Sequence, residues 1–403
     1  MEKSTEIVSM QASARKDLVV LYLCMLVARV GFGVIIIIFP LYLSGASDIA
    51  VALALALYPA LEAVTALPAG RLCDTRGRKR IFIISVGSMA VLMTAIGVSK
   101  DIYLIGALHA LMGVAAAGVT VSTLTMITDL TRENNRGAGM GTFDFMNVGG
   151  YAVGLALGSR LDIAFSGQLG EAFFATGATV AAAFCIAVLV LREPAHAVSS
   201  EKLSVNPLKS IDDRTKATLP IWLAVTITLG MVFFLPRAFA RAGLGSGITA
   251  EILIAGVLVI GMGSVGFGAL SDVVGRTKVL AIGAAGAMCL LVTLSASFMA
   301  GAPVFLQNLP IIGICALATS ALVPSILAMV GDRSLHEMRG SAMGLYSVML
   351  SGGTAIGTVV AGVAHRISGL SGIFEVATVI FAAASVATAA LWLYLSRRAS
   401  KAI

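Results

Sequence analysis

Charged residues are scarce in this sequence. Only 12% of the 403 residues are Asp, Glu, Lys or Arg, whereas 58% are hydrophobic and the mean hydropathy is +0.97. A soluble domain of ordinary composition carries about 25% charged residues, because its surface faces water. The shortage of charge therefore excludes a soluble fold and indicates a protein whose solvent is lipid.

Cysteine and the signature motifs of enzymes are scarce too. The five cysteines are scattered, and no pair has metal-site spacing, so we expect neither a disulfide nor a metal site. No H-E-x-x-H, G-x-S-x-G or phosphate-binding P-loop pattern occurs at a plausible depth. We therefore expect no enzyme, no ATP-driven pump and no cofactor. A receptor or an intramembrane enzyme on the same fold has little support.

Long apolar runs, by contrast, are abundant. They lack the period-two alternation of membrane β-strands, so they indicate helices, each of which needs about 20 residues to cross the bilayer. The first run is too long for a signal peptide and is expected to be the first span of the mature protein. Hydropathy predicts twelve spans, at residues 18–43, 49–70, 81–98, 102–126, 137–160, 171–191, 217–240, 248–270, 279–298, 303–327, 341–364 and 371–395.

Positive charge is distributed unevenly between the loops. Most of the 28 Lys and Arg residues lie in the termini and in alternate loops, which marks those segments as cytoplasmic. We therefore expect an integral protein of a prokaryotic cell membrane with both termini in the cytoplasm. The net charge of +7 reflects this orientation and does not indicate nucleic-acid binding. The positive residues of the predicted outer loops are Lys100, Arg160, Arg237, Arg241 and Arg366.

The sequence contains an internal repeat. The segment from Arg136, RGAGMGTFDFMNVGGYAVG, matches RGSAMGLYSVMLSGGTAIG from Arg339, with its arginine, both methionines and most glycines in common. The longest polar connection separates the repeats. We therefore expect an all-α membrane protein of two pseudo-symmetric six-helix bundles, at 1–192 and 217–403, joined by a cytoplasmic linker at 193–216.

A second repeated motif carries a family resemblance. The loop after the second span reads GRLCDTRGRK, and the loop after the eighth reads GALSDVVGRTK. The first copy resembles the G-x-L-x-D-x-x-G-R-K signature of the major facilitator superfamily, and the resemblance covers the whole chain. Its motif residues are Gly70, Leu72, Asp74, Gly77, Arg78 and Lys79, and those of the second copy include Asp272 and Arg276.

The resemblance implies the major facilitator fold and transport by alternating access, in which the two bundles rock about a central site. The motif loops would then form an inner gate together with Asp129, Arg136, Asp332 and Arg339. It also implies a small-molecule substrate, contact with membrane lipids and no nucleic-acid partner. We expect a monomer.

Two further patterns resemble family elements in altered form. The fifth span has glycines at 141, 150, 154 and 158, as in the glycine motif of family antiporters, but Leu155 and Ser159 replace the usual proline and glycine. Generic small-residue packing explains this pattern about equally well. In the fourth span, His109 and Gly113 match an R-x-x-x-G element with histidine in place of arginine. A titratable group there replaces a permanent cation.

Four ionisable residues lie well inside predicted spans: Arg29, Glu62, His109 and Asp144. An ionised side chain at mid-depth costs about 2.5–3.5 kcal/mol on insertion scales, so such residues usually have a function and a partner. We expect Glu62 and Asp144 to exchange protons and Arg29 to tune them or to hold an anionic group of the substrate. The alternatives are that Arg29 only locks helix packing through one of the carboxylates, and that His109 only packs.

The second half has no comparable group at mid-depth, so the walls of a central cavity would differ. Five further residues are predicted to line it: Tyr58, Asn147, Tyr151, Asn308 and Tyr346. One polar wall and one apolar wall suit an amphiphile better than a sugar. The sequence therefore favours a proton-coupled exporter of amphiphilic or drug-like compounds. A lipid or glycolipid flippase and a proton-coupled organic-anion symporter remain as alternatives.

Overall fold

A computed structural model describes residues 2–42, 47–164, 169–194, 208, 211–241, 246–335 and 338–400. Ten helices in these ranges are long and apolar enough to cross a membrane. Large apolar side chains cover their outer surfaces, for example Val64, Val91 and Leu189, which are 72%, 69% and 83% exposed. Such a surface is stable in lipid and unfavourable in water, and the protein is accordingly an integral membrane protein with several spans.

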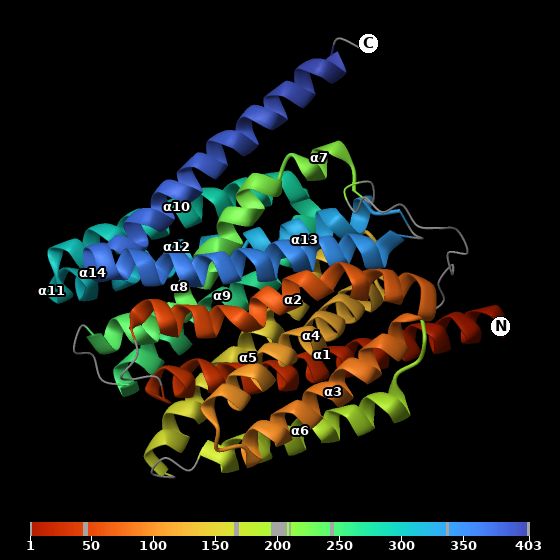
Figure 1. Ribbon diagram of the computed structural model, residues 1–403. Coiled ribbons are helices and arrows are strands. Elements are labelled where there is room, and N and C mark those ends of the chain that lie inside the picture. The colour runs from red at the N-terminus through yellow and green to blue at the C-terminus, as the bar shows by residue number, and fades with distance from the viewer. Residues whose placement is uncertain are drawn as a thin grey trace.

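The first half of the chain forms six long helices, which lie together in the lower part of Figure 1. Helix α1 packs against α5, α2 against α4, and α3 against both α4 and α6. They correspond in order to the first six predicted spans. Their bounds are α1 (Glu2–Tyr42), α2 (Asp48–Arg76), α3 (Arg78–Val98), α4 (Ile102–Leu130), α5 (Arg136–Ala164) and α6 (Leu169–Val190).

The second half forms the upper group of helices in Figure 1. Helix α14 covers the last two predicted spans, which are joined at a kink at Gly369. The φ of Gly369 is 68°, a value that is unfavourable for residues with a side chain. The bounds of the other helices are α7 (Asp213–Lys216), α8 (Leu219–Arg241), α9 (Ser246–Val274), α10 (Arg276–Ala300), α11 (Ala302–Gln307), α12 (Leu309–Thr319) and α13 (Leu322–Arg333), and α14 itself covers Arg339–Ser400.

The tenth predicted span, 303–327, is not one continuous helix. It consists of α11, α12 and α13, which are separated at Asn308 and at Ser320 and Ala321. Pro310 and Pro324 follow these breaks, and a proline has no N–H for the helical hydrogen bond four residues back. The carbonyl of Ser320 is left free of the helical ladder in this way, and it accepts a hydrogen bond from Ser264 instead.

Glycines bring equivalent helix pairs of the two halves into backbone contact. A Cβ on Gly154 of α5 would overlap the Val30 carbonyl of α1, and a Cβ on Gly357 of α14 would overlap the Ile227 carbonyl of α8. These glycines occupy matching positions in the sequence repeat. Small residues let membrane helices approach closely, so the repeat reproduces one packing arrangement, α1 on α5 and α8 on α14.

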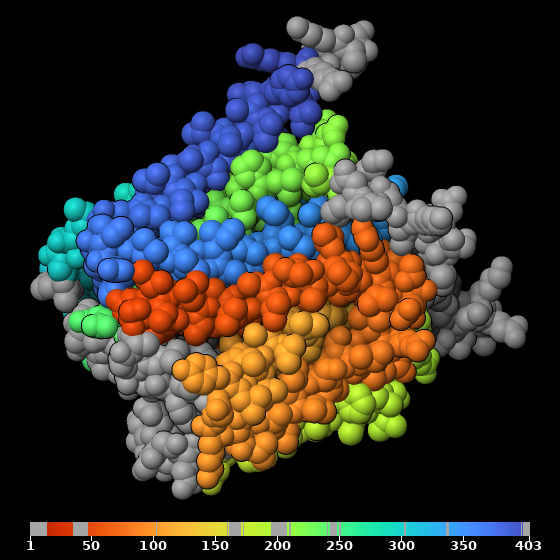
Figure 2. Space-filling view, in the orientation of Figure 1, coloured from red at the N-terminus to blue at the C-terminus, as the bar shows by residue number. Residues whose placement is uncertain are grey.

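Helix α2 joins the two groups of helices. It lies along α14, as Figure 2 shows on the surface, and the two helices share an extensive contact. Asp48 begins α2 and Asp74 lies near its last residue. We use "Asp48 end" and "Asp74 end" for the corresponding ends of the bundle, which are about 40 Å apart along the helix.

Acidification should detach α7 from α13. Arg333 of α13 donates to the carboxylate of Asp212, which also caps α7 through the Thr215 amide. Burial opposes the charged form of Asp212, but the hydrogen bonds from Thr215 and Arg333 outweigh it and hold the pKa of this carboxyl below its usual value. A lowered pKa means that the contact stabilises the attached form above about pH 4 and is lost as the pH falls further.

Amide exchange in α7, measured by mass spectrometry at pH 7, provides the test. Asp212→Asn should speed exchange there severalfold, because the charged acceptor is gone. Asp213→Asn is the matched control, because Asp213 pairs with Lys216 at the exposed surface of the same helix. Equal exchange in Asp212→Asn and the wild type would contradict the assignment.

Candidate functional site

A buried ion pair joins Arg29 of α1 to Glu62 of α2, with Nη2 of Arg29 3.3 Å from Oε1 of Glu62. Thr120 of α4 accepts from Arg29 at 2.7 Å and donates to Glu62 at 3.1 Å. The Tyr58 hydroxyl accepts from the other arm of the guanidinium at 3.2 Å. Three helices thus supply one closed polar network, in which a hydroxyl bridges both charges.

Close approach of α2 and α4 makes this network possible. A Cβ on Gly113 of α4 would overlap the carbonyl of Tyr58, so only glycine allows the two backbones to meet there. Pro59 follows Tyr58 within α2 and removes one helical hydrogen bond. In the altered R-x-x-x-G element, Gly113 therefore has a packing role. It allows α4 to approach the segment of α2 that carries Glu62.

Aromatic rings surround the ion pair. The Phe32 ring lies 4.3 Å from Tyr58 and 5.4 Å from both Tyr151 and Phe233, measured between centroids. His109 is fully inside the first half, stacked on Phe32 and Tyr58 at 5.9 and 5.2 Å. The guanidinium of Arg29 lies 5.7 Å from the Tyr151 ring, within cation–π range. Phe233 is the member of this cluster from the second half.

Asp144 of α5 does not pair with Arg29. Its carboxylate accepts a hydrogen bond from the Ser264 hydroxyl of α9, so the contact joins the two halves of the chain. Both side chains are buried, Asp144 at 6% exposure and Ser264 at 0%. Tyr151 lies two turns after Asp144 on the same helix, and its ring lies beside the Arg29 guanidinium.

Ser264 has several acceptors and one proton. Besides Asp144, the carbonyls of Ile260 and Ser320 lie 3.0 and 3.3 Å from its oxygen. An ionised Asp144 can only accept, so it draws the Ser264 proton. A protonated Asp144 can donate to Ser264 and release that proton toward a carbonyl. Proton binding at Asp144 therefore changes the hydrogen bond between α5 and α9.

The remaining predicted cavity residues lie in different surroundings. Asn147 is buried, and its side-chain oxygen has no hydrogen-bond partner among the described residues. Tyr346 is buried against Trp222, with ring centroids 5.0 Å apart. Asn308 donates to Ser297 of α10 at 2.9 Å, a contact within the second half. Their role as cavity residues remains a prediction.

The predicted gate residues come together at the Asp74 end. The Asp74 carboxylate accepts from the backbone amides of Gly340 and Ser341 at 2.8 and 2.9 Å, at the start of α14. A carboxylate is stabilised at a helix N-terminus, where free amides and the helix dipole both favour it. Asp129 lies between Arg78 and Arg339, at 3.2 and 2.9 Å. A Cβ on Gly70 would overlap the Gly340 carbonyl.

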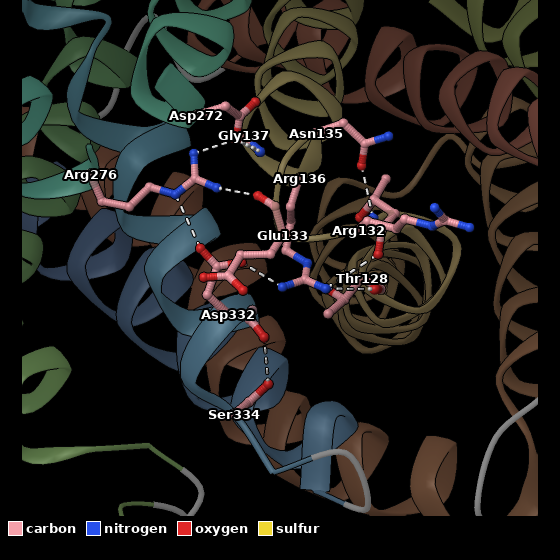
Figure 3. Close-up of polar contacts among 12 residues, drawn as sticks. Thr128, Arg132, Glu133, Asn135, Arg136, Gly137, Asp272, Arg276, Asp332 and Ser334 are labelled. Carbon is pink, nitrogen blue, oxygen red and sulfur yellow. Dashed lines mark hydrogen bonds and ion pairs between the residues drawn. The ribbon is translucent and has the colours of Figure 1, made fainter. Parts of the chain in front are cut away.

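The second motif copy makes the same contacts in the reverse direction. Asp272 accepts from the amides of Gly137 and Ala138, both at 2.9 Å, at the start of α5. Asp332 lies between Arg276 and Arg136, as Figure 3 shows. Each half thus holds the first turn of a helix from the other half, and the Asp74 end is closed in this structure.

Gly77 and Lys79 lie at the turn that leads into α3. Gly77 has a φ of 96°, which favours glycine, and the carboxylate of Glu193 accepts from the amides of Arg78 and Lys79 at 2.6 and 2.9 Å. Leu72 packs against the core at its margin. The sequence did not predict the role of Glu193, although its position three residues after α6 placed a carboxylate at the same end of the bundle as the motif.

A second set of ion pairs closes the opposite end. Asp48 of α2 accepts from Arg237 at 3.0 Å and Arg241 at 3.3 Å, both on α8. Its other oxygen lies 3.1 Å from Nδ1 of His365 on α14. Arg237 and Arg241 were predicted only as loop charges, and Asp48 and His365 were not predicted to take part in a site. The sequence did contain a signal for this contact. Asp48 lies directly before the second predicted span and Arg237 near the end of the seventh, and these ends are predicted to lie on the same side of the membrane.

Comparisons with known proteins agree with this arrangement. The model of the Major Facilitator Superfamily matches residues 21–318 and 234–403. Multidrug resistance protein MdtG of Escherichia coli O9:H4 (strain HS) is 24% identical over 287 residues, which are 67% of this chain and 67% of that protein. MdtG of strain K12 / DH10B is also 24% identical, over 285 residues with the same coverage.

Solved structures show the same fold at low sequence identity. The human organic anion transporter MFSD10 (TETRAN) superposes with a TM-score of 0.76 at 15% identity, over 93% of this chain and 99% of that one. The transporter FucP in its outward conformation superposes with a TM-score of 0.72 at 16% identity, over 94% and 99% of the two chains. At identities this low, the two structures show that the fold is shared, and they carry no information about substrate.

Proposed function

The chain belongs to the major facilitator superfamily and is a secondary transporter, and from this premise we propose that it exports amphiphilic, drug-like compounds in exchange for protons. The observation that supports the proposal is the pair of buried carboxylates with different partners. Glu62 lies in a closed network with Arg29, and Asp144 lies at the contact between the halves.

We assign proton coupling to both carboxylates, and Asp144 is the one that acts at the contact between the halves. Its partner in the structure is a neutral hydroxyl, whereas Glu62 has a guanidinium. An ionised carboxylate inside a membrane protein needs a compensating partner, so taking up a proton is an available way to neutralise Asp144. Because that proton changes the hydrogen bond to Ser264, protonation is communicated to the contact between α5 and α9.

Glu62 and Arg29 would respond to substrate. A cationic substrate can take the place of the guanidinium beside Glu62, and an anionic group can take the place of Glu62 beside Arg29. Either exchange alters the charge balance of the network and hence the protonation of its carboxylate. The surrounding rings of Phe32, Tyr151 and Phe233 offer stacking surfaces to a planar apolar group.

The substrate class follows from the two walls of the site and from the named relatives. On the wall from the first half are the charged side chains of Arg29 and Glu62. On the wall from the second half is the apolar ring of Phe233. An amphiphile satisfies both walls. The MdtG proteins are named for multidrug resistance, which supports drug-like compounds. The Asp74 end would face the cytoplasm, and substrate would leave at the Asp48 end.

Substrate-induced proton release provides the test. Purified protein in weakly buffered detergent should release protons when a lipophilic cation such as ethidium is added, because substrate and proton compete. Asp144→Asn should reduce the release by at least about half, since one of two carboxylates is gone. Release that is equal in Asp144→Asn and wild type would contradict the role of Asp144.

Two further probes separate the alternatives, benzoate in the same proton assay and a fluorescent phospholipid in vesicles that contain the protein. Benzoate as the probe should cause proton uptake if the protein is an organic-anion symporter, with Arg29 as carboxylate anchor. Movement of a fluorescent phospholipid between leaflets, without any proton signal, would favour a flippase. Ethidium-driven release together with no response to the other two probes is the result expected for an exporter of amphiphilic compounds.

A further inference from the structure

The ion-pair cluster at the Asp48 end has no counterpart in the repeated motifs. One carboxylate from the first half meets three side chains of the second half, Arg237, Arg241 and His365. The side chain of Asp48 is 14% exposed, and those of Arg237 and His365 are 9% and 11% exposed. Buried charges are rarely tolerated without a function or a compensating partner. Here each charge has a partner, and that partner belongs to the other half.

The cluster clamps the same two helices that the Asp74 end clamps. Asp74 holds the start of α14 at Gly340 and Ser341, and Asp48 contacts His365, which lies just before the kink at Gly369. A Cβ on Gly362 would overlap Ala52, so α2 and α14 also touch closely beside the cluster. Rocking of the two halves about a central site must therefore break one clamp while it keeps the other.

His365 distinguishes the two clamps chemically. Arginine keeps its charge at any physiological pH, whereas an imidazole is neutral or charged according to whether it holds a second proton. Among the described residues, His365 contacts the charged Asp48 of α2, and Arg237 and Arg241 of α8 contact the same carboxylate. The adjacent Arg366 of its own helix is exposed. Phe234 of α8 covers the ring edge, with centroids 5.8 Å apart.

We propose that Asp48, Arg237 and His365 form a proton-binding gate at the outer end of the transporter, which closes when His365 takes up a proton from the outside. An imidazolium donates a charge-assisted hydrogen bond to Asp48, and such bonds are about twice as strong as neutral ones. Arg237 contacts the other oxygen of the carboxylate, and the more exposed Arg241 is screened by solvent. When His365 is neutral, Asp48 keeps only its two ion pairs with arginine, and the contact between the halves is weaker.

This gate gives the transport cycle a direction. Outside acid would close the outer end after substrate has left, and the transporter would return to the cytoplasmic side in its protonated form. The proposal rests on the alternating access of the proposed function, but it does not depend on the roles of Glu62 or Asp144. Their failure in the proton-release assay would leave the gate untouched.

A distance between spin labels tests the gate without substrate or gradient. Labels at Ala50 of α2 and Ser368 of α14, both exposed, flank the cluster on opposite halves. The background should lack Cys185, Cys289 and Cys315, because the other two cysteines are buried. In lipid nanodiscs, lowering the pH from 8 to 5.5 should raise the ratio of closed to open populations by about fivefold, the lower range of two-state coupling.

Three variants decide the outcome. His365→Asn should remove this response, because the side chain no longer titrates. His365→Lys should populate the closed distance at both pH values, because its charge is permanent. Asp48→Asn should favour the open distance at both pH values.

His196→Gln, in the predicted linker, is the control and should respond like the wild type. A wild-type response in both His365 variants would overturn the proposal.

Discussion

Replacing Glu62 by glutamine should lower proton-driven transport in proteoliposomes by at least about tenfold, while exchange of labelled for unlabelled substrate at equal pH continues. Glutamine keeps a hydrogen-bond acceptor for Arg29 but carries no titratable proton. The tenfold loss corresponds to about 1.4 kcal/mol in the rate-limiting barrier. A fluorescent pH gradient assay and a radiolabel exchange assay on the same vesicles would separate the two activities.

Thermal stability distinguishes coupling from packing. If the ion pair only locks α1 to α2, Glu62→Gln should lower the melting temperature and leave the ratio of transport to exchange unchanged. Glu62→Ala is the severe comparison, because removing one partner of a buried pair typically costs about 3–5 kcal/mol. Full proton-driven transport in a stable Glu62→Gln protein would contradict the proposed role of Glu62.

Replacing Gly70 by alanine should hold the Asp74 end open and reduce transport by at least about tenfold. The added Cβ would overlap the Gly340 carbonyl. A backbone group cannot turn aside as a flexible side chain can, so α2 and α14 must separate there, and overpacking of this kind typically costs about 1–3 kcal/mol. The amides of Gly340 and Ser341 would then move away from Asp74.

Cysteine labelling reports the opening directly. Ala342 is fully buried at the start of α14, so a cysteine introduced there should react slowly with a water-soluble maleimide and rapidly once Gly70→Ala is added. Gly266→Ala is the matched control, because a Cβ on Gly266 of α9 meets no atom within 4 Å. Equal labelling in the presence and absence of Gly70→Ala would refute the expected opening.

The sequence predicted much of the fold because membrane helices are specified locally. Each span is an apolar run bounded by polar turns, and the lipid enforces helical structure on it. The prediction failed in detail in the tenth span, where hydropathy does not register the separate effects of Pro310 and Pro324. The kink at Gly369 is compatible with the predicted boundary between the last two spans.

The candidate site was less accessible from the sequence. Arg29, Glu62 and Asp144 attract attention because charge is rare in apolar runs. Their partners, Thr120 and Ser264, are ordinary residues in membrane helices, and nothing in one sequence distinguishes them from neighbours. Pairing of Glu62 rather than Asp144 with Arg29 depends on the rotation of three helices about their axes, which small-residue contacts such as Gly113 against Tyr58 determine.

The reciprocal contacts at the Asp74 end also bear on how the protein withstands a substitution there. Asp74 holds α14 and Asp272 holds α5, so two equivalent locks act in parallel. A change that weakens one lock leaves the contacts of the other lock in place. The second copy has Thr277 where the first has Lys79. Duplication thus gives this transporter a second lock at the Asp74 end, whereas the cluster around Asp48 is single among the described residues.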